Sequence, residues 1–164
     1  MPNRYEEKWL ETVARQEELL VFDHFSREDG LALGLKIAEL AITKYTNVGI
    51  RILSDDFIVF TYMMEGSTMN NNWWMDKKLN VCRKTGVSSL RAALEFVYGV
   101  REKEPWTANE GNYALVGGCI PIRLKSGELA GWALVSALPH EQDHQLIADA
   151  MADFLTISIP SILE

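Results

Sequence analysis

Apolar positions recur along this chain with two periods, one typical of helices and the other of strands. Spacings of three and four residues predict five helices, which we expect at 4–20, 26–44, 70–86, 88–97 and 139–160. Ser26 is expected to cap the second helix, because its hydroxyl precedes two acidic residues in a first turn. Gly86 is expected to end the third helix in a left-handed conformation, and Pro160 to end the last.

Alternating positions predict two hairpins and one short extra strand at 20–22. The first hairpin joins 48–52 to 57–64, and the second joins 119–124 to 129–135. Residues 57–64 are apolar on both faces, which is typical of a central strand covered on each side. Pro121 cannot donate to a strand ladder, so we expect an edge or a bulge there. The pattern predicts an α/β (α+β) fold with helices on both faces of the sheet.

Composition agrees with one folded domain over residues 1–164, because 48% of the 164 residues are apolar and no linker interrupts them. The net charge is −7, which disfavours binding to nucleic acid or to an anionic membrane surface. We find no export signal and no membrane-spanning segment, so we expect a cytoplasmic protein. Cys82 and Cys119 match no metal spacing and are expected to be buried, reduced thiols.

Three segments resemble the GlcG/HbpS-like family, and specifically its uncharacterised branch found in yeast and bacteria. The first segment is the run from Tyr113 to Arg123, with its glycine pair followed by Ile-Pro-Ile-Arg. The second runs from Ser136 to His144 and reads Ser-Ala-Leu-Pro-His-Glu-Gln-Asp-His. The third is Asn-Trp-Trp-Met-Asp-Lys-Lys, which ends at Lys78 and is followed by a serine pair. Their order and separation make the resemblance fairly specific over nearly the whole chain.

The resemblance implies a profilin-like antiparallel sheet of about five strands, flanked by helices and assembled into a homo-oligomer. Relatives in this family include haem-binding proteins, but a family likeness does not by itself establish a function. Family members commonly carry a histidine just before the glycine pair, where this chain has Val116. A valine can neither ligate iron nor move a proton, which weakens the case for haem. Ala137 replaces a usual glycine.

Six residues from these segments are the candidate ligand-binding set, on the expectation that the three segments converge on one concavity. The set is Trp74, Lys78, Gly117, Gly118, Asp143 and His144. The glycine pair allows close backbone approach to a ligand, although we favour the explanation that it forms a tight turn or bulge entering the strand. His140, Asp143 and His144 share a helix face, and either a metal site or first-turn acids would account for them. We favour the acids and expect no metal site.

Three functions remain open at the level of the sequence. The preferred one is a non-catalytic, homo-oligomeric protein that binds a small organic molecule, with haem among the candidates. The second is an enzyme of tetrapyrrole or small-acid metabolism that uses His144 and Asp143 for proton transfer. The third is an assembly component whose output is a protein contact. Ser88, Ser89 and Ser136 lack the context of a catalytic nucleophile, so we identify no catalytic residue.

Overall fold

A five-stranded sheet organises this computed structural model, which describes residues 3–163, so residues 1–2 and 164 of the expected domain lie outside the described part. The strands lie in the order β1-β4-β5-β2-β3, and every pairing is antiparallel except that of β1 with β4. Their bounds are β1 Val21–Phe22, β2 Gly49–Ser54, β3 Phe57–Met63, β4 Cys119–Leu124 and β5 Leu129–Ser136. The predicted sheet and both predicted hairpins are therefore confirmed.

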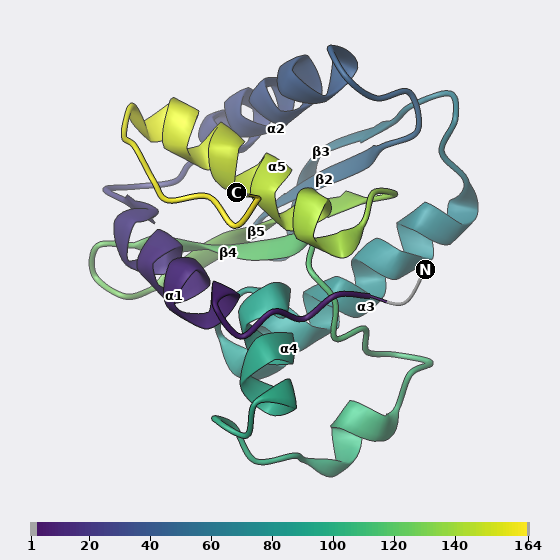
Figure 1. Cartoon of the computed structure of the whole chain (residues 1–164). Coiled ribbons are helices and arrows are strands. Elements are labelled where there is room, and N and C mark those ends of the chain that lie inside the picture. Colours follow the sequence, from purple (N-terminus) through teal and green to yellow (C-terminus); the bar gives the residue numbers. More distant parts are fainter. Residues whose placement is uncertain (1–2, 164) are drawn as a thin grey trace.

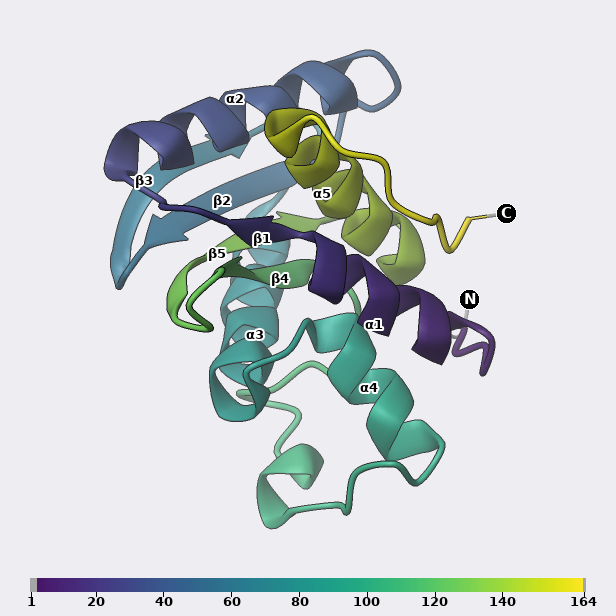
Figure 2. The ribbon, with the colours of Figure 1, turned by 90° about the vertical axis from the view of Figure 1, so that its left-hand side faces the viewer.

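Helices cover both faces of this sheet, as predicted (Figure 1). Within residues 3–163 the helices are α1 Trp9–Leu19, α2 Arg27–Ile42, α3 Met69–Thr85, α4 Ser89–Val97 and α5 His140–Leu155, with a 3₁₀ turn at Pro105–Ala108. Helices α2 and α5 pack on one face, and α3 packs on the other. Figure 2 shows α1 and α4 packed against each other beside the β1–β4 edge.

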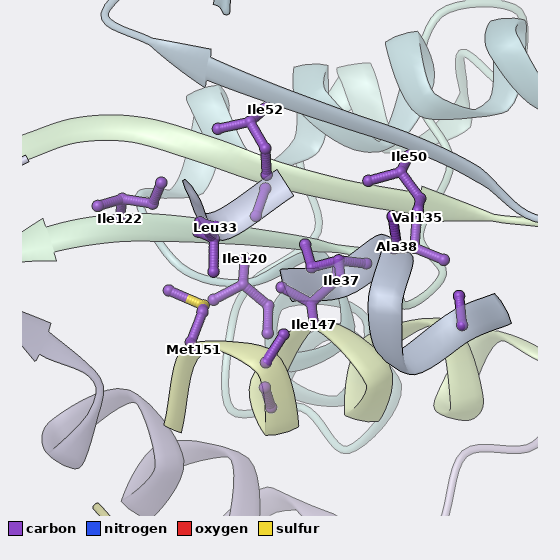
Figure 3. Close-up of a cluster of buried hydrophobic side chains, with 14 of the residues drawn as sticks. Leu33, Ile37, Ala38, Ile50, Ile52, Ile120, Ile122, Val135, Ile147 and Met151 are labelled. Carbon is purple, nitrogen blue, oxygen red and sulfur yellow. The ribbon is translucent and has the colours of Figure 1, made fainter. Parts of the chain in front are cut away.

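The main core lies between the sheet and the α2–α5 layer. Figure 3 shows how apolar side chains of the two helices interdigitate with those of the strands. Its fully buried members include Leu33, Ile37, Ile50, Ile52, Ile120, Ile122, Val135, Ile147 and Met151. A smaller core on the other face joins α3 to β4 and β5, and both cysteines lie in it as free, buried thiols. The apolar periodicity of the sequence thus placed these elements correctly.

Local capping signals explain where several helices begin and end. The Ser26 hydroxyl accepts from Asp29 N, while the Asp29 carboxylate accepts from Ser26 N, so a full capping box starts α2. Thr68, two residues before the first of the expected asparagines, caps α3, and Asn71 completes that box. Gly86 ends α3 with φ 72°, as predicted.

The predicted start of the first helix and the predicted end of the last helix were inaccurate. The first helix begins at Trp9 rather than at residue 4, because the preceding residues form an extended segment and a turn. The last helix ends at Leu155, because Thr156 takes the left-handed conformation with φ 56°. Residues after Thr156 fold back along the molecule, where Pro160 O accepts a hydrogen bond from Gln16 Nε2 of α1. Pro160 therefore belongs to this return segment and does not stop the helix.

The prediction for the β2–β3 hairpin was wrong about which strand is central. All six residues of β2 are buried, since β2 lies between β5 and β3. Strand β3 is the sheet edge, and Phe57 and Ile58 are 58% and 57% exposed. A strand that is apolar on both faces need not be central when its outer surface is available for another contact. Pro121 lies in the part of β4 that β1 does not reach, which agrees with the edge prediction.

No helix among residues 3–163 has both the length and the apolar character needed to cross a membrane.

Candidate functional site

A cavity of about 250 Å³ lies where the first turns of α3 and α5 meet the end of β5 and the N-terminal segment. In Figure 1 these parts lie on the same side of the molecule. Its lining combines apolar and polar side chains: Asn3, Asn70, Asn71, Trp74, Lys78, Val116, Ser136, Ala137, Leu138, His140 and Asp143. The three sequence segments of the family resemblance therefore converge on one concave site.

A buried ion pair forms the floor of this cavity. Nζ of Lys78 lies 2.9 Å from Oδ2 of Asp143 and donates a second hydrogen bond, also of 2.9 Å, to the carbonyl oxygen of Val135. Both residues are only 2% exposed. Oδ1 of Asp143 accepts from Leu138 N at 3.0 Å, so both oxygens of the carboxylate are occupied. Burial raises the pKa of Asp143 to about 6 despite the neighbouring ammonium.

Helix geometry brings Trp74 and Lys78 to the same cavity. They are four residues apart on α3, so both side chains extend from one face of that helix. Trp74 is 37% exposed, and Trp73 beside it is more exposed, so neither tryptophan enters the core. Nζ of Lys77 lies 5.1 Å from the centre of the Trp74 ring, a cation–π contact on the outer side of the cavity.

The glycine pair lies behind the ion pair, where a side chain would not fit. A Cβ at Gly117 would lie 2.4 Å from the carbonyl oxygen of His140, and one at Gly118 would lie 2.5 Å from Nζ of Lys78. Gly118 also has φ 125°, a conformation that L-residues rarely adopt. Neither glycine lines the cavity. The two glycines let α5 and the Lys78 ammonium group approach the start of β4 closely.

His140 lines the cavity, but both of its ring nitrogens are engaged. Gly117 N donates to Nδ1 at 2.9 Å, so Nδ1 carries no proton and the neutral ring is protonated at Nε2. Nε2 then donates to the carbonyl oxygen of Arg4. Burial lowers the pKa of His140, which agrees with the neutral form. This imidazole therefore anchors the N-terminal segment to the glycine pair.

His144 is fully buried and does not line the cavity. The side-chain amide of Gln16 donates to Gln145 and to Pro160, so its oxygen accepts from Nε2 of His144 at 2.8 Å. Nδ1 of His144 has no hydrogen-bond partner among residues 3–163. Burial lowers the pKa of this ring to about 3, so it is neutral at physiological pH. This hydrogen bond ties α5 to α1, and Gln16 in turn binds the C-terminal segment.

Ser136 and Ala137 form the remaining wall, where β5 runs into α5. Ser136 is 3% exposed and lines the cavity, and its hydroxyl makes no side-chain hydrogen bond within residues 3–163. Ala137 has φ 143°, which is strained for any residue with a Cβ. The glycine that the family usually carries at this position would adopt that angle without strain.

Two further hollows adjoin the main cavity, and Trp74 lines all three. The second hollow, of about 480 Å³, extends past Trp73 and Asn112. The third, of about 400 Å³, extends past Tyr5 and Tyr113 under the irregular stretch that follows α4. The Trp74 side chain therefore stands at the junction of a longer groove.

No group of three or more histidine, cysteine or acidic side chains in the described chain is placed to hold a metal ion. His140, Asp143 and His144 do share the buried face of α5, but each is bound to a different partner.

Burial raises the pKa of the Cys82 thiol, which keeps it protonated.

Of the candidate set, Trp74, Lys78 and Asp143 line the cavity, the glycine pair supports it from behind, and His144 lies outside it. Sequence reasoning left out several lining residues, which are Asn3, Asn70, Asn71, Val116, Ser136, Ala137, Leu138 and His140. Most of these lie in the three segments of the family resemblance, but only the fold shows that they reach the cavity. Asn3 carried no signal, because only the path of the N-terminal segment brings it to the site.

Comparison with known proteins gives one family. The model of the family described as haem degrading protein HbpS-like matches residues 25–152. A UPF0303 protein of Brucella canis is 34% identical over 142 residues, which cover 86% of this chain and 84% of the relative. A UPF0303 protein of Brucella anthropi is 34% identical over 144 residues, covering 87% and 85%.

Solved structures share this fold at low sequence identity. The Ybr137w protein of yeast superposes with a TM-score of 0.78 at 22% identity, covering 90% of this chain and 88% of that one. HbpS of Streptomyces reticuli gives 0.64 at 17% identity, covering 80% and 87%. A complex of PduOC with haem gives 0.63 at 18% identity, covering 84% and 97%.

Proposed function

This chain belongs to the HbpS-like family, and we propose that it binds a small organic molecule in the Trp74 cavity, acts as a homo-oligomer and catalyses no reaction of its own. The ion pair of Lys78 and Asp143 is the observation that carries the proposal. Burying two charges costs several kcal/mol per ion (order of magnitude) and is only partly offset by pairing them. Because the ion pair adds little stability, its presence at the floor of the cavity is better explained by an interaction with a ligand.

Binding without catalysis is supported by the hydrogen bonds of two titratable side chains at the cavity, Asp143 and His140. Asp143 and His140 are both bound to groups of the protein itself, so neither is free to take a proton from a ligand. His144, the base in the alternative enzyme hypothesis, is separated from the cavity. A general base must lie within hydrogen-bond reach of the proton that it abstracts.

Haem is a candidate ligand because a structural relative was solved in complex with it. The residues at this cavity do not fit an axial histidine ligand, however. Both nitrogens of His140 are engaged, Val116 stands where the family commonly has a histidine, and the cavity holds only about 250 Å³. Pockets for drug-sized ligands span about 300–1,000 Å³, so we favour a ligand smaller than haem.

Homo-oligomerisation is supported by an apolar surface on the outer edge of the sheet. Strand β3 has a neighbour on one side only, and its seven residues include no charged side chain. Beside it, Leu31 and Leu35 project from α2, whose Gly30 and Gly34 pack against β3. An uncharged, unpaired edge strand promotes association unless another chain covers it. A second copy of this chain is the occupant that we propose for the β3–α2 surface, because every copy carries the same exposed edge.

A role as an assembly component is the second candidate. Val97 and Val100, at the end of α4, are exposed and lie apart from the β3–α2 surface. Apolar residues that remain exposed after self-association favour a contact with a different protein. Ligand binding requires an intact Trp74 cavity, whereas a role as an assembly component does not.

The binding proposal is tested by titrating the purified protein with haem and a panel of small metabolites, followed by absorbance, tryptophan fluorescence and thermal shift. We expect at least one small compound to bind, and Trp74→Ala to weaken it roughly tenfold or more. Trp73→Ala is the matched control, because that side chain lines only the second hollow. Responses that stay flat across the panel, or that ignore Trp74→Ala, would overturn the proposal. Haem binding that His140→Ala abolishes would contradict the preference for a ligand smaller than haem.

A further inference from the structure

The cavity offers hydrogen-bond donors that the described protein does not use. An ammonium group has three N–H donors, and Lys78 directs two of them to Val135 O and Asp143 Oδ2. The third has no acceptor within residues 3–163. The Ser136 hydroxyl, at the same cavity, also lacks a partner there. Both groups are therefore available to donate to a ligand that accepts hydrogen bonds.

The buried acceptors beside these donors are already taken. Both carboxylate oxygens of Asp143 accept hydrogen bonds from the protein, and the carbonyl oxygen of Val135 accepts from Lys78. The cavity also lies at the N-termini of two long helices, α3 and α5, whose dipoles favour negative charge. The chemistry of the floor therefore favours an anion with at least two oxygens.

The other part of the cavity is apolar. Trp74, Val116 and Leu138 line it, and they offer a surface for a short hydrocarbon or aromatic group. The volume of about 250 Å³ is below the range of about 300–1,000 Å³ that holds drug-sized molecules. A compact molecule with one anionic end and one apolar end matches both halves.

We propose that the cavity binds a small carboxylic acid as its anion, with one carboxylate oxygen accepting from Nζ of Lys78 and the other from Oγ of Ser136, and with the apolar body against Trp74. This inference rests on the proposed function and gives its ligand class. A carboxylate suits the site because its two oxygens can accept from two separate donors at once.

Binding of this anion is coupled to a proton. The charged group nearest Asp143 is Lys78 of α3. On the same helix as Asp143, His140 is neutral, and the buried Glu141 lies 3.9 Å from the guanidinium of Arg4 in the N-terminal segment. A second carboxylate beside Lys78 would favour the protonated form of Asp143. Affinity for the anion therefore rises as the pH falls from 8 to 6, by up to about tenfold per unit.

The test uses calorimetric titration of the whole protein with acetate, propanoate and benzoate, each beside its neutral primary amide. We expect at least one acid to bind about tenfold or more tightly than its amide, because a charge-assisted hydrogen bond is worth about 1.5–3 kcal/mol. Ser136→Ala should weaken that acid about threefold to tenfold, from the loss of one hydrogen bond. Ser126→Ala, on the exposed turn between β4 and β5, is the matched control and should change nothing.

Because Lys78→Met alone leaves Asp143 buried and unpaired, the charge requirement is tested in the double variant Lys78→Met/Asp143→Leu. It should abolish the preference for acid over amide, and it should abolish the pH dependence of binding. The ligand class would be overturned if the wild type bound each acid and its amide with equal affinity. It would also be overturned if Ser136→Ala bound the acids as tightly as the wild type does. If only an uncharged compound binds and Trp74→Ala weakens it, the ligand class fails and the proposed function survives. If no compound binds at all, both fail.

Discussion

Gly118 lies so close to Lys78 that a methyl group on the glycine would stand 2.5 Å from the lysine Nζ. The same methyl group would stand 2.5 Å from Val135 O, which is an acceptor of that ammonium. Gly118 thus determines whether Lys78 can reach its two buried partners. The glycine pair acts on the cavity through the lysine and not through direct contact with the cavity space.

Replacing Gly118 with alanine should therefore destabilise the protein in two ways. The positive φ becomes strained, which costs about 1–3 kcal/mol, and the buried ammonium loses its hydrogen bonds, at a similar or larger cost. Gly127→Ala is the control, since Gly127 has φ 93° but no atom within 4 Å of the added Cβ. Chemical denaturation should give a clearly larger loss for Gly118→Ala than for Gly127→Ala. Equal losses would show that the lysine does not depend on this glycine.

Ala137→Gly should stabilise the protein. The φ of 143° at Ala137 costs about 1–3 kcal/mol for a residue with a Cβ, and glycine removes that cost. Glycine also gains freedom in the unfolded chain, which offsets about 0.5–1 kcal/mol. We expect a net gain of about 1 kcal/mol in the free energy of unfolding, measured with urea. Ala130→Gly, at a strand position with ordinary φ, should lower stability instead. A loss at both positions would contradict the strain at Ala137.

His144 should make the protein sensitive to acid. Its pKa is about 6.5 in the unfolded chain and about 3 in the folded protein, so the unfolded state binds the proton first as the pH falls. The stability that the neutral ring confers is present above pH 6.5 and is lost as the pH falls toward 3. His144→Gln keeps a donor for Gln16 but does not titrate.

The stability difference between the wild type and His144→Gln should therefore shrink by about 3 kcal/mol between pH 7 and pH 4. Comparing these two proteins removes the opposite effect of Asp143, whose raised pKa is common to both. Urea denaturation at several pH values measures the difference. A difference that does not change with pH would mean that His144 can be protonated in the folded state.

Ile58→Lys should reduce the size of the assembly. Ile58 is 57% exposed on the unpaired edge of β3, and a lysine there would place a charge in the β3–α2 surface that we assign to a second copy. Light scattering after size-exclusion chromatography should show a lower mass for this variant than for the wild type. Val100→Lys, which also changes an exposed apolar residue but lies away from that surface, should keep the wild-type mass. An unchanged mass for Ile58→Lys would exclude β3 from the interface.

The sequence alone determined where most helices and strands lie, because the signals for them are local. Ser26 and Gly86 have side-chain and backbone preferences that act within a few residues, and the structure uses both as expected. The sequence also indicated which three segments meet at the cavity, and Trp74, Lys78 and Asp143 of the candidate set line it.

The tertiary structure decided everything that depends on what lies beside a residue. A strand that is apolar on both faces, as β3 is, can be either a central strand or an edge strand whose outer side binds another chain. Only the strand order distinguishes the two. The sequence placed Lys78 on the same helix face as Trp74, but only the fold shows that it is buried against Asp143 and beside Gly118. His144 follows Asp143 directly, but it is buried against Gln16 of α1 and does not line the cavity. Burial and hydrogen-bond partners come from chain segments far apart in the sequence, and no local pattern encodes them.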